Sequence, residues 1–119
     1  MIILTLFTLL ILKHFIIDFP AQTPYQWMNK GTYGHPGGIL HAGLHGFGTV
    51  LCFVWWAPFA SIILGIMDML IHYHIDWAKM TINRNKHLTP QDQEFWFWLG
   101  LDQLAHFLTY VGILAILIL

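Results

Sequence analysis

Four pairs of ionisable side chains, each inside a different apolar segment, place the strongest constraint on how this chain can fold. The members of each pair lie four residues apart: His14 and Asp18, His41 and His45, His72 and Asp76, and Asp102 and His106. That spacing puts both members on one face of an α-helix, one turn apart. Because ionisable groups are costly in an apolar environment and usually mark a functional site there, the pairs predict one shared site between packed helices.

The composition favours lipid as the surrounding solvent. Of the 119 residues, 57% are hydrophobic and 9% are charged, and the mean hydropathy is +0.63. A soluble domain of this size could not bury so much apolar surface. A net charge of −1 gives no reason to expect nucleic acid as a partner. The single cysteine, Cys52, excludes an internal disulfide framework and a thiolate metal cluster.

The apolar segments predict an all-α fold, an antiparallel four-helix bundle that forms one integral membrane domain over residues 1–119. The spans are expected at about residues 2–19, 38–57, 59–79 and 90–119, each close to the roughly 20 residues that cross a bilayer. Thr89 and Pro90 predict the start of the last helix, with Thr as the cap and Pro as the first helical residue. The N-terminus lacks the basic region and cleavage site of a secretory signal, so the first segment is expected to remain as an anchor.

The basic residues predict the orientation in the membrane. Four spans place both termini on one side, and Lys30, Lys79, Arg84 and Lys86 all belong to the loop side opposite them. By the positive-inside rule the two long loops are expected to be cytoplasmic and both termini outside.

The helix directions bring all four pairs toward this cytoplasmic face. A deeper layer is expected to hold His14, His45, His72 and His106, and a shallower layer to hold Asp18, His41, Asp76 and Asp102. A rise of about 1.5 Å per residue separates the layers by about 6 Å.

Imidazole and carboxylate groups in this combination predict a bound divalent metal. Zinc suits them best, with iron or manganese as alternatives. All eight paired residues, five His and three Asp, are candidate ligands, and they exceed the four that one zinc ion takes. Two ions, or one ion with further carboxylates that orient the histidines, both remain open. In a hydrolytic site Asp18, Asp76 and Asp102 are also the catalytic candidates, one of them serving as general base.

Four other polar residues are predicted to support the cluster or contact a substrate. They are Gln22, Asp68, Lys79 and Gln103. Asp68 lies one turn before His72 and could orient that ring or form a packing hydrogen bond. Lys79 could bind an anionic head group, or extend its ammonium to the membrane surface.

The same residues resemble a known family. The run from His14 through Asp18 to Gln22, followed by Trp27 and Lys30, resembles the opening of domain-of-unknown-function family 3307. Three later motifs continue the resemblance: His41-x-x-x-His45, His72-x-x-x-Asp76-x-x-Lys79 and Asp102-Gln103-x-x-His106. The chain departs from the pattern at Ile17, where the family often has Gly. The resemblance implies a small membrane protein of bacteria or their phages, and hence the bacterial inner membrane.

A more distant resemblance to predicted metal-dependent hydrolases of the inner membrane favours a hydrolase over an oxidase. The leading hypothesis is a zinc-type hydrolase acting on a membrane-associated substrate such as a lipid or polyprenyl phosphate. The alternatives are a di-iron membrane oxygenase, a proton or ion transporter or channel, and a phage accessory protein whose polar pairs only fix helix packing. Membrane lipid is the expected partner, and Gly43, Gly46 and Gly48 would let a second copy approach to form a homo-oligomer.

Overall fold

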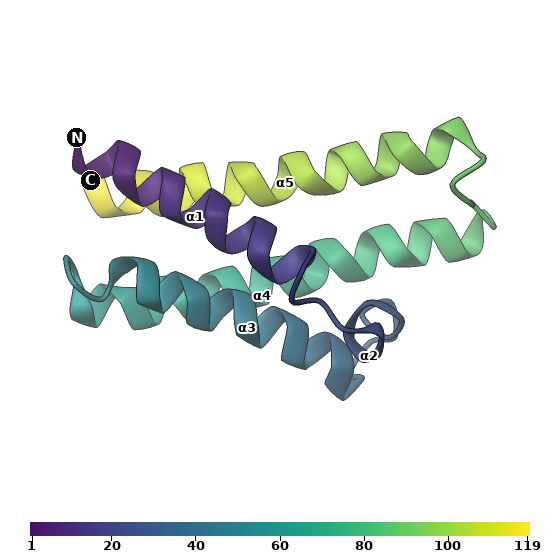
Figure 1. Cartoon of the computed structure of the whole chain (residues 1–119), viewed down its shortest axis with the longest axis horizontal. Helices are drawn as coiled ribbons and strands as arrows, with labels where there is room; N and C mark the ends of the chain where they lie inside the picture. The colour runs from purple at the N-terminus through teal and green to yellow at the C-terminus, as the bar shows by residue number, and fades with distance from the viewer.

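The computed structural model describes all 119 residues as five helices without strands, which confirms the predicted all-α class. The helices are α1 (Ile2–Asp18), α2 (Pro24–Trp27), α3 (Pro36–Phe53), α4 (Pro58–Asn85) and α5 (Gln93–Ile118). The four long helices run alternately in opposite directions, and both termini lie at the same end of the molecule (Figure 1). Two of them, α4 and α5, are long and apolar enough to cross a membrane. The α1 and α3 helices are shorter, with 17 and 18 residues.

The start of α5 differs from the prediction. The N-cap residue is Asp92, whose backbone is extended with φ −91° and ψ 131°, and the helix begins at Gln93. The Oδ2 atom of Asp92 accepts hydrogen bonds from the Thr89 backbone amide at 2.7 Å and from the Thr89 hydroxyl at 3.0 Å. The predicted cap at Thr89 is therefore wrong. The Thr89 hydroxyl instead donates to Asp92 and closes a separate turn that precedes the helix.

The buried face of each long helix is apolar toward the end of the molecule that holds the two termini and polar farther from that end. On α1 and α4 the buried residues follow a four-residue period: Leu6, Leu10, His14 and Asp18, and Leu64, Asp68, His72 and Asp76. The apolar part forms one cluster near the two termini, consisting of Leu6, Leu10, Cys52, Phe53, Leu64, Tyr110, Ile113 and Leu114. The ionisable residues fill the interior between this apolar cluster and the other end of the helices.

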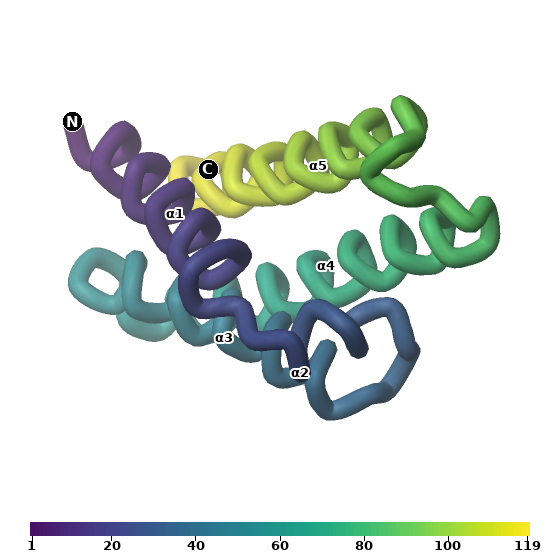
Figure 2. Tube along the Cα trace, turned by 45° about the vertical axis from the view of Figure 1, so that its right-hand side comes forward, coloured from purple at the N-terminus to yellow at the C-terminus, as the bar shows by residue number.

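The segment between α1 and α3 folds back against α3, while α4 and α5 extend beyond it (Figure 1). Thr23 has an extended backbone and Pro24 occupies the first position of α2, where a missing backbone N–H costs no hydrogen bond. Figure 2 shows α2 beside the end of α1 and the start of α3. The fold buries two polar side chains of this segment, Gln26 at 4% exposed and Lys30 at 8%. A Cβ atom on Gly38 would lie 3.0 Å from the Lys30 Cα, so a glycine permits the close approach.

Two glycines let α3 and α4 cross at close range. A Cβ atom on Gly46 would lie 2.6 Å from the backbone oxygen of Gly65, and one on Gly65 would lie 2.7 Å from the oxygen of Gly46. Gly48 faces the Lys13 side chain, whereas Gly43 has nothing within 4 Å. Gly43, Gly46 and Gly48 were predicted to let a second copy approach. Only Gly43 has space for a Cβ atom without a contact inside the chain, so only Gly43 is available for such an approach.

Gly46→Val should destabilise the protein far more than Gly43→Val. Both changes replace a helical glycine by the same residue, so the difference in helix propensity cancels between them. Only the valine at position 46 is forced against the α4 backbone, and overpacking of this kind costs about 1–3 kcal/mol. Unfolding in a mixed detergent series would measure the difference, and equal stability of the two variants would contradict the close crossing.

Candidate metal centre

All eight paired residues are buried in one connected cluster. Their exposed fractions are at most 7%, and each long helix contributes two of them: His14, Asp18, His41, His45, His72, Asp76, Asp102 and His106. The two predicted layers are in direct contact, because the Asp18 carboxylate reaches His41 of its own layer and His45 of the deeper one. The carboxylates and imidazoles therefore share a single interior space.

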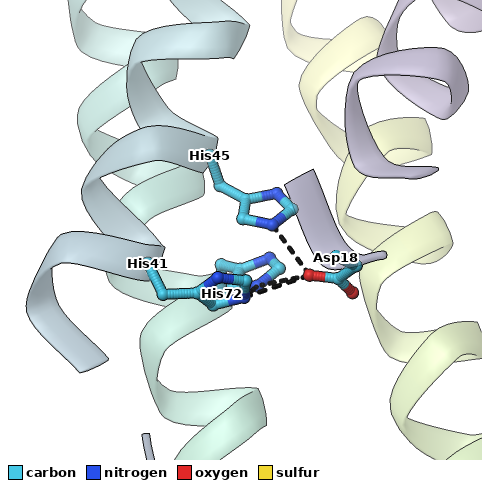
Figure 3. A group of neighbouring side chains, drawn as sticks. All are labelled: Asp18, His41, His45 and His72. Atoms are coloured by element: carbon cyan, nitrogen blue, oxygen red, sulfur yellow. Dashed lines mark hydrogen bonds and ion pairs between the residues drawn. The ribbon is translucent and has the colours of Figure 1, made fainter. Parts of the chain in front are cut away.

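Four of these residues from three helices form the tightest group (Figure 3). The Asp18 Oδ1 atom lies 3.0 Å from His41 Nε2, 2.9 Å from His45 Nε2 and 3.7 Å from His72 Nε2. The Nε2 atoms of His41 and His72 are 3.3 Å apart. Ligand atoms bound about 2.0–2.1 Å from a zinc ion lie about 3.3 Å from one another in a tetrahedron. Four of the six distances within this group, between 2.9 and 3.7 Å, therefore lie near the edge length of a tetrahedral metal site.

A second group of possible ligands adjoins the first. His106 Nε2 lies 3.3 Å from Asp76 Oδ1 and 3.6 Å from Asp102 Oδ1. The other oxygen of Asp76, Oδ2, lies 3.3 Å from both His41 Nε2 and His72 Nε2. Asp76 thus faces both groups, with one oxygen toward each.

His14 connects the two groups from the side of α1. Its Nε2 atom lies 3.1 Å from Asp18 Oδ2, and its ligand atom falls within 4.8 Å of those of His72 and His106. The rings of His45 and His72 stack at 3.5 Å, and those of His72 and His106 at 4.0 Å. His72 therefore lies at the centre of the cluster.

Two of the histidines, His14 and His41, turn Nε2 toward the cluster and hold Nδ1 against an outer partner. His14 Nδ1 lies 2.9 Å from the Tyr110 hydroxyl, and His41 Nδ1 lies 3.3 Å from Gln26 Oε1. Histidines that bind metal almost always hold their second nitrogen in this manner, which fixes the ring orientation. His45 differs, because the Lys13 ammonium lies 3.4 Å from its Nδ1 and can only donate to it, so this contact does not hold an Nδ1–H as the partners of the other two rings can.

Several buried polar atoms of the cluster have no hydrogen-bond partner. They include His72 Nδ1 and Asp102 Oδ1; Asp76 Oδ2 also makes no hydrogen bond of good geometry, although the Lys30 ammonium lies 3.3 Å from it. A polar network that served only to pack helices would be expected to satisfy such atoms, because an unpaired buried polar group is costly. Two of the three are carboxylate oxygens that face imidazole nitrogens, so the residues present fit a cation placed among them.

The one lysine beside the three carboxylates of the cluster does not balance their charge. Asp18, Asp76 and Asp102 bring three negative charges, and the one lysine in contact with them is Lys30, whose Nζ lies 3.3 Å from Asp76 Oδ2. Burial alone would lower the pKa of Lys30, but Asp76, then Asp18 and Asp102, outweigh burial and raise it. The ammonium therefore stays charged, and two negative charges remain. One divalent ion, or protons on two of the histidines, would balance them.

Asp68 belongs to a separate ion pair rather than to His72. Its Oδ2 atom lies 2.6 Å from Lys13 Nζ and accepts a hydrogen bond from the Thr49 hydroxyl at 2.6 Å. Lys13 also donates to the backbone oxygen of His45 at 3.3 Å. Asp68 therefore reaches the cluster only through Lys13 and His45.

The other three supporting residues take different positions. Gln103 Oε1 lies 2.9 Å from His14 Nε2, and its amide nitrogen donates to Asp102 Oδ2 at 3.0 Å. Gln22 donates to the backbone oxygen of Asp18. Lys79 forms no ion pair; it lines a groove of about 210 Å³ between α4 and α5, and Asp102 lies in the wall of that groove.

Four residues in contact with the cluster were not among the predicted site residues. They are Lys13, Gln26, Lys30 and Tyr110. Tyr110 follows His106 by four residues, so the spacing that identified the pairs could also have found it. Gln26 and Lys30 lie in the segment around α2, where no helical period indicates which side chains point inward.

One family model matches nearly the whole chain. Its description is "Protein of unknown function (DUF3307)", and it matches residues 6–119. Neither the curated proteins nor the solved structures gave a match to the chain.

Proposed function

We propose that this chain, which belongs to the DUF3307 family, is a four-span membrane metalloprotein that hydrolyses a membrane-associated phosphate ester. The eight paired residues would supply the ligands and the catalytic carboxylates. Zinc is the ion that the donor set suits best. A lipid or polyprenyl phosphate is the substrate class that fits a buried site beside a groove between α4 and α5.

The distribution of polar and apolar side chains supports a membrane location. The buried residues comprise 14 polar or charged and 9 hydrophobic side chains, while large hydrophobic residues are exposed along every long helix. Water would penalise both features, whereas lipid favours them. At about 1.5 Å per residue α1 and α3 extend about 26 Å, close to the roughly 30 Å of a hydrocarbon core. Lys30, Arg84 and Lys86 lie toward the end opposite the termini, which supports cytoplasmic loops; the bacterial inner membrane is the location we propose.

The main support for a metal site is that the imidazole Nε2 atoms converge on carboxylate oxygens. Asp18, His41, His45 and His72 have the spacing of a four-ligand site. Asp76 and Asp102 lie alongside as further ligands or as the general base. A polar path suited to ion passage has less support, because the apolar cluster around Phe53 and Leu64 fills the interior beyond Asp68.

The residues around the cluster can each take a part in hydrolysis. A divalent ion held there would act as a Lewis acid and lower the pKa of a water molecule. The water oxygen forms a bond to phosphorus, the ester P–O bond breaks, and the leaving alcohol takes up a proton. A carboxylate beside the site, Asp76 or Asp102, would accept the proton of the water and pass it on. The Lys30 ammonium would bind the phosphate, and the groove beside Lys79 would admit it from the lipid.

Purified protein loaded with zinc should release phosphate from a phosphatidate or a polyprenyl phosphate in mixed micelles. Asp76→Asn should lower kcat by about 100-fold or more, as expected for loss of a catalytic carboxylate. The matched control is Asp92→Asn, because Asp92 is exposed and caps α5 away from the cluster. Equal activity of the two variants would contradict the proposed role of Asp76, and retention of iron with consumption of oxygen would favour an oxygenase.

A further inference from the structure

We infer that the cluster holds two divalent ions bridged by the Asp76 carboxylate, with the second ion bound by Asp76, Asp102 and His106. This inference rests on the proposed function, which needs only one ion. It assigns a metal site to the second group of ligands and makes both Asp76 and Asp102 ligands, so that neither serves as the general base and the loss of kcat in Asp76→Asn would follow from loss of metal.

The two oxygens of Asp76 point to two different sets of ligands. Oδ2 lies 3.3 Å from His41 Nε2 and from His72 Nε2, both members of the four-residue group. Oδ1 lies 3.3 Å from His106 Nε2, which belongs to the other group. A carboxylate that faces two ligand sets in this manner can bind one ion through each oxygen. Paired ions in hydrolytic enzymes lie about 3.5–4 Å apart, and the stacked rings of His72 and His106, 4.0 Å apart, show that the two sets are neighbours.

Asp102 provides an independent indication of the second ion. It is 5% exposed, and its Oδ1 atom has no hydrogen-bond partner although it faces His106 Nε2 at 3.6 Å. Its other oxygen is already occupied, because it accepts a hydrogen bond from Gln103. The free oxygen is thus held in a fixed direction, as expected for a ligand whose partner is a cation.

The net charge of a site with two ions favours an anionic substrate. The three carboxylates and Lys30 leave two negative charges, so two divalent ions turn the site net positive by two. An anion such as a phosphate ester restores the balance, and a neutral ester does not. The second group offers only three protein ligands and adjoins the groove between α4 and α5, so a phosphate oxygen entering from that groove can complete its coordination.

Manganese titration of metal-free protein tests this inference directly. Protein in detergent should bind two equivalents of Mn²⁺, and its electron paramagnetic resonance spectrum should show the exchange coupling of two ions sharing a carboxylate. Asp102→Asn, which preserves size, should bind one equivalent and lose the coupling. Asp92→Asn, the exposed control at the N-cap of the same helix, should behave as wild type.

Saturation of the wild-type protein at one equivalent, or at two equivalents without coupling, would overturn the inference. Neither result would affect the proposed function if the one-ion protein still released phosphate. Conversely, two coupled ions in a protein that hydrolyses no phosphate ester would support the two-ion site and remove the hydrolase assignment.

Discussion

His72→Ala is expected to remove bound metal from the protein almost completely. His72 belongs to the four-residue group, and its ring lies between those of His45 and His106. Changes to residues that only orient a ligand weaken metal binding about 10–100-fold, so removal of a ligand that also packs against the second group should exceed that range. Elemental analysis of the purified variant would measure the loss.

The control for this variant is His74→Ala. His74 lies on the same helix but is exposed, and its ring hydrogen-bonds the Tyr33 hydroxyl at 3.0 Å. Its loss should leave the metal content unchanged. Circular dichroism and gel filtration would establish that both variants remain folded. Equal metal content in the two folded variants would contradict the assignment of His72.

Asp68→Ala should cost the largest amount of folding free energy of the changes considered. Lys13 is 8% exposed and Asp68 is its one carboxylate partner within ion-pair distance. Removing one member of a buried pair leaves the other charge uncompensated, which costs about 3–5 kcal/mol. Unfolding in a mixed detergent series would measure the loss.

The double variant Lys13→Met with Asp68→Leu should recover most of that stability, because apolar residues of similar volume can replace a buried ion pair. Glu94→Ala is the matched control: it breaks the exposed Lys86–Glu94 pair, where solvent screens the charges, and should change stability little. A double variant no more stable than Asp68→Ala would show that the loss does not come from the unpaired lysine.

Local periodicity explains why the sequence could predict that the eight paired residues meet. A spacing of four fixes the face of a helix regardless of tertiary structure, and the order of residues within each segment fixes the depth. Sequence alone therefore predicted the helical class and the residues of the cluster. Their roles as metal ligands stay a prediction.

The residues that sequence reasoning missed depend on contacts between elements. Lys13 adjoins His14 and starts from a different face of α1, yet its long side chain runs across Gly48 to reach Asp68. A Cβ on Gly48 would lie 2.6 Å from Lys13 Cγ, so that route exists only because the facing residue is glycine. Lys30 reaches Asp76 only because the segment around α2 folds back onto α3, which no local pattern indicates.

X-ray absorption at the metal edge of the purified protein tests the central claim most directly. The site described here predicts a coordination shell of nitrogen and oxygen at about 2.0–2.1 Å for zinc, with the outer-shell scattering of several imidazole rings. A protein that stays folded and retains no metal after zinc loading, or one whose metal shows no imidazole scattering, would contradict it and leave the His/Asp pairs as a packing network.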